Sequence, residues 1–308
     1  MKNIIESRFY ILHPLALLLY FIILFTCTIL FSNPIYLLSI SIITLSLVLY
    51  YTNTKEIALN LKTFLFVGFL FFILNPLTMH EGTHVLFYLL GQPITLEATS
   101  YGLYAMILII TMFMIFIVLN FIINNERFLY LFSKIAPQIS FTISLSLRYI
   151  TLFTKRLKEI IDVQKTRGTH IENIGSKFSL NNIKQKVIQI GTSLKSLLSW
   201  SLEEGMTTAE VLKAKNYGSC KRTNYTLFTK NTTDKIMITI YSLSLIAIIG
   251  LRIIGIGGYS YYPTILNPLQ STMDIYGLIF IIILLISPHL LDIGLTIKRG
   301  VIRATNTN

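Results

Sequence analysis

The chain has 308 residues, of which 53% are hydrophobic and 13% charged, and its mean hydropathy is +0.66. This composition excludes an ordinary soluble globular protein and indicates an integral membrane protein. The formal net charge is +12, and 18 of the 26 Lys and Arg residues lie between positions 127 and 235. The two cysteines, Cys27 and Cys220, imply no disulfide framework.

Six apolar stretches are long enough, or nearly so, to cross a bilayer core of about 30 Å. They cover residues 14–31, 34–51, 57–77, 103–123, 236–256 and 275–291. The third is the least regular, because Asn60 and Lys62 lie near its start. The expected fold is an all-α membrane protein with about six transmembrane helices. Four spans fall in residues 1–124 and two in residues 236–308.

The positions of Lys and Arg in the short flanking segments predict the orientation. The N-terminus, the loop after the second span, the segment 125–235 and the tail are basic, whereas the loops 32–33, 78–102 and 257–274 contain no Lys or Arg. The pattern predicts a multi-pass cell-membrane protein with both termini in the cytoplasm. Arg252, near the outer end of the fifth span, is interpreted as a cation that reaches the interface.

The cytoplasmic segment 125–235 contains two long amphipathic patterns. Apolar residues recur at helical spacing in 139–164 and again in 187–213, with charged residues between them. We expect two helices of about 40 Å each at 1.5 Å per residue. Residues 169–186, rich in Asn, Ser and Gly, are expected to form a turn-rich connection.

Both predicted helices finish in a cation followed by a residue that tolerates a left-handed backbone. The pairs are Arg167-Gly168 and Lys215-Asn216. One such end is an ordinary helix C-cap. Two such ends on the cytoplasmic side of a membrane protein suggest attachment points for a partner, since a charge-assisted contact contributes roughly 1.5 to 3 kcal/mol.

Four stretches carry a resemblance to a known family. They are Arg8 to Pro14, Asn75 to Gly102, Leu147 to Gly168 and Ser201 to Thr223. In order and spacing they resemble the transmembrane T component of energy-coupling factor transporters, the CbiQ-like family of ABC-type importers for vitamins and metals. The resemblance covers most of residues 8 to 223.

The resemblance implies that the two helix ends are coupling motifs that dock into two cytoplasmic ABC ATPase subunits. The motifs would fall on Thr166, Arg167, Gly168, Ala214, Lys215 and Asn216. It also implies a separate small membrane protein that captures a vitamin or a transition-metal ion. The chain itself is then a non-catalytic subunit without a cofactor, whose partners bind ATP and Mg. Accordingly, the sequence has no phosphate-binding G-x-x-x-x-G-K-[ST] loop.

The second motif departs from the family pattern, because Lys215-Asn216 stands where the family has Arg followed by a small residue. Lysine keeps the positive charge but lacks the planar fork that pairs with a carboxylate through two hydrogen bonds. We therefore expect a looser contact at this end than at Arg167.

A rival motif is His80-Glu81-Gly82-Thr83-His84, which fits the H-E-x-x-H signature of zinc metalloproteases. A membrane-bound metalloprotease is the alternative hypothesis, and contact of His80 and His84 with a transported metal ion is a weaker variant. Gly82 and the nearby Pro76 disfavour the helix that this motif requires. A third hypothesis, nucleic-acid binding by the basic segment, is disfavoured because few aromatic residues interleave with its charges.

Overall fold

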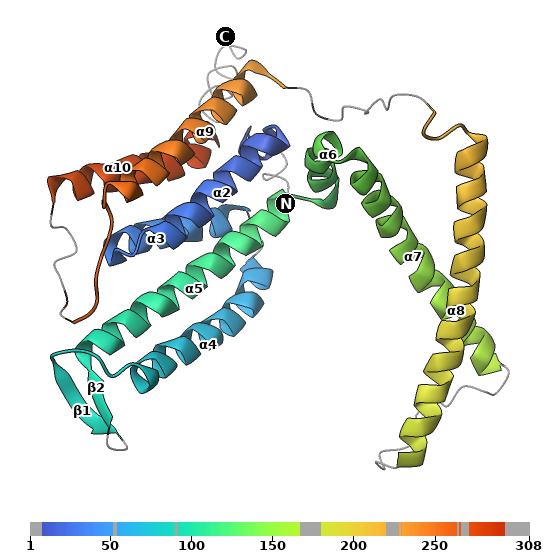
Figure 1. Cartoon of the computed structure of the whole chain (residues 1–308), viewed down its shortest axis with the longest axis horizontal. Coiled ribbons are helices and arrows are strands. Elements are labelled where there is room, and N and C mark those ends of the chain that lie inside the picture. Colours follow the sequence, from blue (N-terminus) through green and yellow to red (C-terminus); the bar gives the residue numbers. More distant parts are fainter. Residues whose placement is uncertain are drawn as a thin grey trace, which may run out of the picture. The chain divides into compact units, whose positions relative to one another are not determined.

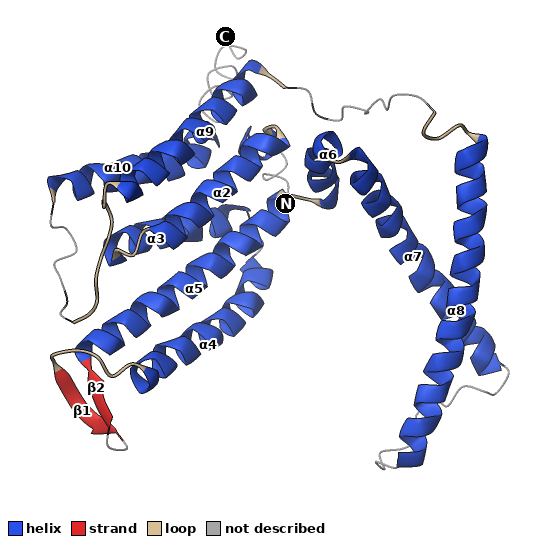
Figure 2. Cartoon of the chain, in the orientation of Figure 1, coloured by secondary structure: helices blue, strands red, loops and turns tan. Residues whose placement is uncertain are grey.

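The computed structural model describes residues 8–51, 54–89, 92–166, 180–219, 228, 230–263, 265 and 271–292. Its described part is almost entirely helical, with one short β-hairpin (Figure 1, Figure 2). Packing divides the chain into two compact units, residues 1–128 with 228–308 and residues 129–227.

The elements of the first unit are α1 (Arg8–Ile11), α2 (Pro14–Leu30), α3 (Pro34–Tyr51), α4 (Thr54–Thr78), β1 (Val85–Leu89), β2 (Gln92–Thr95), α5 (Leu96–Ile122), α9 (Thr232–Ile253) and α10 (Thr272–Leu285). The helix α6 (Asn125–Ile135) crosses the boundary between the units. The second unit contains α7 (Pro137–Thr166) and α8 (Leu180–Ala214).

The expected all-α membrane fold is confirmed, and each of the six apolar stretches overlaps a helix. By length and composition, three described helices, α3, α5 and α9, are able to cross a membrane. The other three apolar segments are shorter: α2 has 17 residues, α10 has 14, and residues 62–78 form the apolar part of α4. A helix is the expected form here, because all its interior backbone hydrogen bonds are made within the segment.

The core of the first unit lies around α2, which packs against α9, α5 and α3. Leu17, Tyr20, Phe21 and Ile115 are almost completely buried in it. Outside this core, α4 packs along α5 (Figure 1). A Cβ atom on Gly102 would lie only 2.9 Å from the carbonyl oxygen of Phe72, so glycine permits this close approach of the two helices.

Four buried tyrosines connect the first unit through their hydroxyl groups. Each hydroxyl forms a hydrogen bond with the segment from Asp274 to Asp292: Tyr20 with the Leu285 carbonyl (2.8 Å), Tyr36 with the Asp274 carbonyl (2.5 Å), Tyr51 with Asp292 Oδ2 (2.7 Å) and Tyr241 with Ser287 Oγ (2.9 Å). These bonds satisfy polar groups that would be costly to leave unpaired in an apolar core.

Arg127 fixes the N-terminal segment to the end of α5. Its guanidinium donates to the carbonyl oxygens of Ile122 and Tyr10, both at 2.9 Å, and lies 4.0 Å from the centre of the Tyr10 ring. Burial lowers the pKa of this guanidinium, because an apolar environment disfavours its charge. The sequence pattern did not single out this residue.

Three boundaries differ from the sequence-based expectations. The helix α5 begins at Leu96 rather than at residue 103, because the Thr95 side chain caps it by accepting from the Ala98 N–H at 3.3 Å. The hairpin β1–β2 lies within residues 78–102, which were expected to form a loop. The helix α8 begins at Leu180, so residues 180–186 are helical and not part of a turn-rich connection.

Candidate functional site

The helices α7 and α8 form an antiparallel pair, and polar contacts fix their register. Tyr149 donates to Thr208 Oγ1 at 2.8 Å, and Ser193 donates to Gln164 Oε1 at 3.0 Å. Later residues of α7 therefore contact earlier residues of α8. The two helices cross one another in Figure 1.

Aromatic contacts agree with this register. Phe153 meets Trp200 edge to face, with ring centres 5.7 Å apart, and the Arg156 guanidinium lies 5.6 Å from the Trp200 ring. Nearer the start of α7, Phe141 stacks on Tyr217, with ring centres 4.7 Å apart. Such pairs contribute about 0.5–1.5 kcal/mol beyond the area that they bury. No periodicity in the sequence predicted these partners.

The antiparallel register places the two predicted coupling ends at opposite ends of the pair. The end of α7 at Thr166 lies near the level of Ser193, because Gln164 contacts that residue. From Ser193, α8 continues to its own end at Ala214. At 1.5 Å per residue, the two ends are about 30 to 35 Å apart along α8.

The end of α8 has the C-cap geometry that the sequence predicted. Asn216 has φ +56°, in the left-handed region. Its N–H donates to the Lys213 carbonyl at 3.0 Å, and the Tyr217 N–H donates to the Leu212 carbonyl at 2.9 Å. This pair of bonds is the Schellman motif, in which asparagine is the usual substitute for glycine. Lys215 and Asn216 are exposed, so the cation is accessible.

At the other end, Thr166 is the last residue of α7, and Arg167 and Gly168 lie outside the described residues. The Thr166 hydroxyl donates to the Val163 carbonyl at 2.9 Å, within the last turn. Lys165 and Asp162 form an exposed ion pair at 3.8 Å. The structure therefore describes one residue of the first motif and all three of the second.

One face of α8 carries apolar side chains of which about half or more of the surface is exposed. Leu194, Leu198, Leu202 and Met206 follow one another at intervals of four residues, and each is at least 48% exposed. Intervals of four place them along one ridge of the helix. The pair α7–α8 thus buries only part of its apolar surface.

The structure does not give the rival zinc motif the helix that it requires. The helix α4 ends at Thr78, and the residues from His80 to His84 have no helical turn. Gly82 has φ +146°, a conformation that interrupts a helix. In the H-E-x-x-H signature, a helix brings the two histidines to one metal ion, and that helix is missing from this segment. Within the described ranges, no three His, Cys, Asp or Glu side chains gather closely enough to hold a metal ion.

Glu97, at the start of α5, binds the same segment through its carboxylate. It is fully buried, and its Oε1 accepts from the Thr83 N–H at 3.1 Å, the Thr83 hydroxyl at 2.9 Å and the His84 N–H at 3.3 Å. A Cβ on Gly82 would lie 2.6 Å from Oε2. The carboxylate therefore fastens the segment after α4 to the start of α5.

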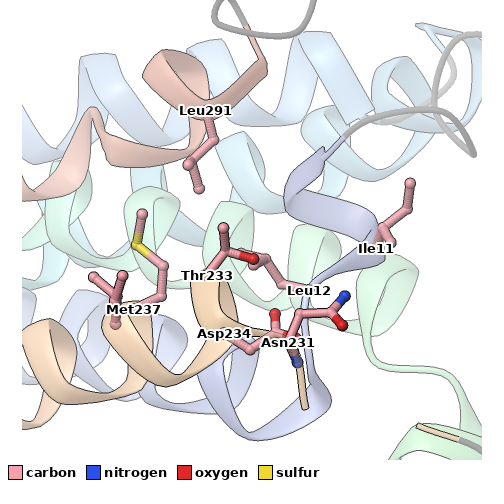
Figure 3. A pocket seen from close by; sticks show the side chains of 8 residues that line it. Ile11, Leu12, Asn231, Thr233, Asp234, Met237 and Leu291 are labelled. Atoms are coloured by element: carbon pink, nitrogen blue, oxygen red, sulfur yellow. Dashed lines mark hydrogen bonds between the residues drawn. The ribbon is translucent and has the colours of Figure 1, made fainter. Parts of the chain in front are cut away.

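A pocket of about 320 Å³ lies beside the N-terminal segment (Figure 3). It is lined by Ile11, Leu12, Asn231, Thr233, Asp234, Ile236, Met237 and Leu291. The Asp234 carboxylate accepts from the backbone N–H groups of His13 at 3.1 Å and Asn231 at 2.9 Å. Asp234 therefore ties the N-terminal segment to the start of α9. This is a structural arrangement of backbone donors around one carboxylate.

Comparison with known families assigns residues 10–226 to the model of the cobalt transport protein family, CbiQ. No curated protein matches the chain closely enough to count as a relative. The matched range contains α2 to α5, the hairpin and the antiparallel pair α7–α8. Since the match covers well over half of the chain, the chain belongs to the CbiQ family of cobalt transport proteins and is a membrane component of a transport system.

Proposed function

We propose that this chain is the energy-coupling membrane subunit of an ECF-type ABC importer. Two cytoplasmic ATPase subunits bind the helix ends at residues 166–168 and 214–216. ATP binding and hydrolysis in those subunits move α7 and α8. The movement reaches a separate small membrane protein, which carries a vitamin or a transition-metal ion. The chain contributes no catalytic group, and its partners bind ATP and Mg.

The observation that carries the proposal is the separation of the two helix ends. About 30 to 35 Å corresponds to the diameter of a small domain, so one groove on one partner does not reach both ends. Two partner subunits side by side fit this spacing. Antiparallel packing, fixed by Tyr149 with Thr208 and by Ser193 with Gln164, creates the separation.

The proposed orientation follows from charge. Residues 125–235 hold most of the Lys and Arg, and the positive-inside rule places such a segment in the cytoplasm. Both termini are then cytoplasmic as well. Soluble ATPases approach the chain from that side, and Lys215 is exposed at the end of α8.

The experiment compares Arg167→Ala, Lys215→Ala and the double variant. Each substitution removes one charge-assisted contact, so ATPase affinity falls roughly ten- to a hundredfold per site. Copurification of the ATPases and substrate uptake measure the loss, which is largest in the double variant. Lys213→Ala is the matched control, because it removes a neighbouring exposed cation of α8. Normal copurification and uptake in the double variant would contradict the docking role.

Gentle purification identifies the partners directly. We expect two related ATPases and a small hydrophobic protein to copurify with the chain. The identity of the small protein then shows whether the substrate is a vitamin or a metal ion. Stoichiometric zinc that disappears in His84→Ala would instead support the metalloprotease hypothesis.

A further inference from the structure

The first strand of the hairpin formed by β1 and β2 exposes a row of apolar side chains. In β1, Val85 is 44% exposed, Leu86 52%, Phe87 53% and Tyr88 71%. Residues 85–95 contain no charged side chain. Exposed large apolar residues in a row indicate a surface that is covered by something other than water.

The unpaired N–H and C=O groups of the hairpin limit the surroundings in which it is stable. In the part of the chain that the structure describes, the sheet has two antiparallel strands, so each strand keeps one unpaired edge. An isolated two-stranded hairpin is marginally stable in water. Open edges are not tolerated in the hydrocarbon core of a bilayer either, because their N–H and C=O groups find no partner there. The interfacial layer satisfies both conditions, since it accepts apolar side chains and supplies water and headgroups to the backbone.

The hairpin is held at the end of a helix that is long and apolar enough to cross a membrane. It connects α4 to this helix, α5. Its base is held by the buried Glu97, which binds Thr83 and His84, and by the Leu96 N–H, which donates to the His84 carbonyl at 2.9 Å. The strands therefore start at the end of a transmembrane segment and have little freedom to leave it.

The direction of the strands agrees with this placement. In Figure 1 the hairpin runs crosswise to the axes of α4 and α5. A five-residue strand is about 17 Å long. If it continued along the axis of α5, it would extend beyond an interfacial layer of roughly 5 to 8 Å. A crosswise strand remains within that layer along its whole length.

We propose that the β1–β2 hairpin lies in the plane of the membrane interface and binds the lipid surface, with Tyr88 as its aromatic anchor. Aromatic side chains favour this layer, where the ring contacts acyl chains and a hydroxyl reaches water. The binding partner is thus the lipid bilayer itself. This inference concerns a surface that is separate from the proposed coupling ends and is independent of their function.

A tryptophan reporter tests the proposal in the full-length chain. The natural sequence has one tryptophan, Trp200, so Trp200→Phe provides a background for Tyr88→Trp and, in a second variant, Leu86→Trp. Each protein is reconstituted into phosphatidylcholine vesicles that carry bromine either near the headgroup or near the methyl end of the acyl chain. Phe69→Trp, at an exposed position of α4, is the matched control within a span.

We expect headgroup-proximal bromine to quench about half of the fluorescence of the two hairpin reporters, and methyl-end bromine to quench clearly less. The Phe69→Trp control should show the reverse order. Quenching of both hairpin reporters by aqueous acrylamide, with no effect of either brominated lipid, would overturn the proposal in favour of a hairpin in water. Protection from acrylamide and from both lipids would overturn it in favour of a protein that covers the hairpin.

Discussion

Both units expose apolar side chains, but the first unit also has a core in which large side chains are buried against one another. In α7 and α8, none of the apolar side chains that the structure describes is buried. Tyr20, Tyr36, Tyr51 and Tyr241 are fully buried, and their hydroxyls have partners within the unit. On α8, by contrast, Leu202 is 66% exposed. Two helices alone bury only the surface between them, so part of the apolar surface of α7 and α8 remains exposed.

The two units are held together by different kinds of interaction. The first unit depends on buried polar groups that cannot be removed without leaving their partners unsatisfied. The second unit depends on a helix pair whose contacts are partly exposed and individually weaker. Substitutions in the two units should therefore differ in kind: those in the first change stability, and those on the exposed face of the second change association.

The largest effect is expected for Asp292→Ala in the first unit. Asp292 is buried and accepts from Tyr51 at 2.7 Å and from the Phe9 N–H at 3.3 Å, so its loss leaves two donors without this acceptor. We expect a cost of about 3 kcal/mol. Thermal unfolding in detergent measures it.

Asp162→Ala is the control from the second unit. Asp162 forms an exposed ion pair with Lys165, so its removal should change stability by less than about 0.5 kcal/mol. Equal melting temperatures for Asp292→Ala and Asp162→Ala would contradict the view that the first unit depends more strongly on its polar contacts.

A smaller effect is expected at the end of α8. Asn216 has φ +56°, which a β-branched residue adopts poorly, so Asn216→Val should destabilise the last turn by about 1–2 kcal/mol. Asn216→Gly should stabilise it slightly, by about 0.5 kcal/mol. Hydrogen exchange of the amides near Tyr217 measures both changes. Faster exchange in the glycine variant than in the natural chain would contradict this account of the cap.

The smallest change in stability is expected for Leu198→Gln combined with Leu202→Gln. Both side chains are more than 60% exposed, so the free energy of unfolding should change by less than about 0.5 kcal/mol per site. The yield of the assembled transporter should fall, because this face is expected to be covered in the complex. Ser199→Gln, on the same helix, is the control. An unchanged yield would show that the face stays uncovered.

The sequence predicted the helical spans well because the signal is local. Transfer of a side chain into a bilayer depends mainly on that side chain, so a sum over about 20 residues locates each span. The predicted stretch 34–51 coincides with α3, and 14–31 differs from α2 by one residue. The C-cap at Lys215-Asn216 was also predicted, since asparagine adopts the left-handed backbone more readily than most residues.

The candidate site was predicted only in part. Sequence reasoning identified both helix ends, of which Arg167 and Gly168 lie outside the described residues. It did not identify the pairing of Tyr149 with Thr208, which joins residues 59 positions apart. It also read His80 to His84 as a possible ligand set, whereas Glu97 binds the backbone of that segment. Short motifs show which residue types are present but not the backbone that carries them.

Local sequence signals were enough to predict an all-α membrane protein with a basic central segment, because hydropathy, charge and caps act over a few residues. The antiparallel packing of α7 and α8, the separation of about 30 to 35 Å between their ends, and the pairing of β1 with β2 next to the segment bound by Glu97 were apparent only in the three-dimensional structure. These features depend on contacts between residues that are distant along the chain, and such contacts leave no period in the sequence.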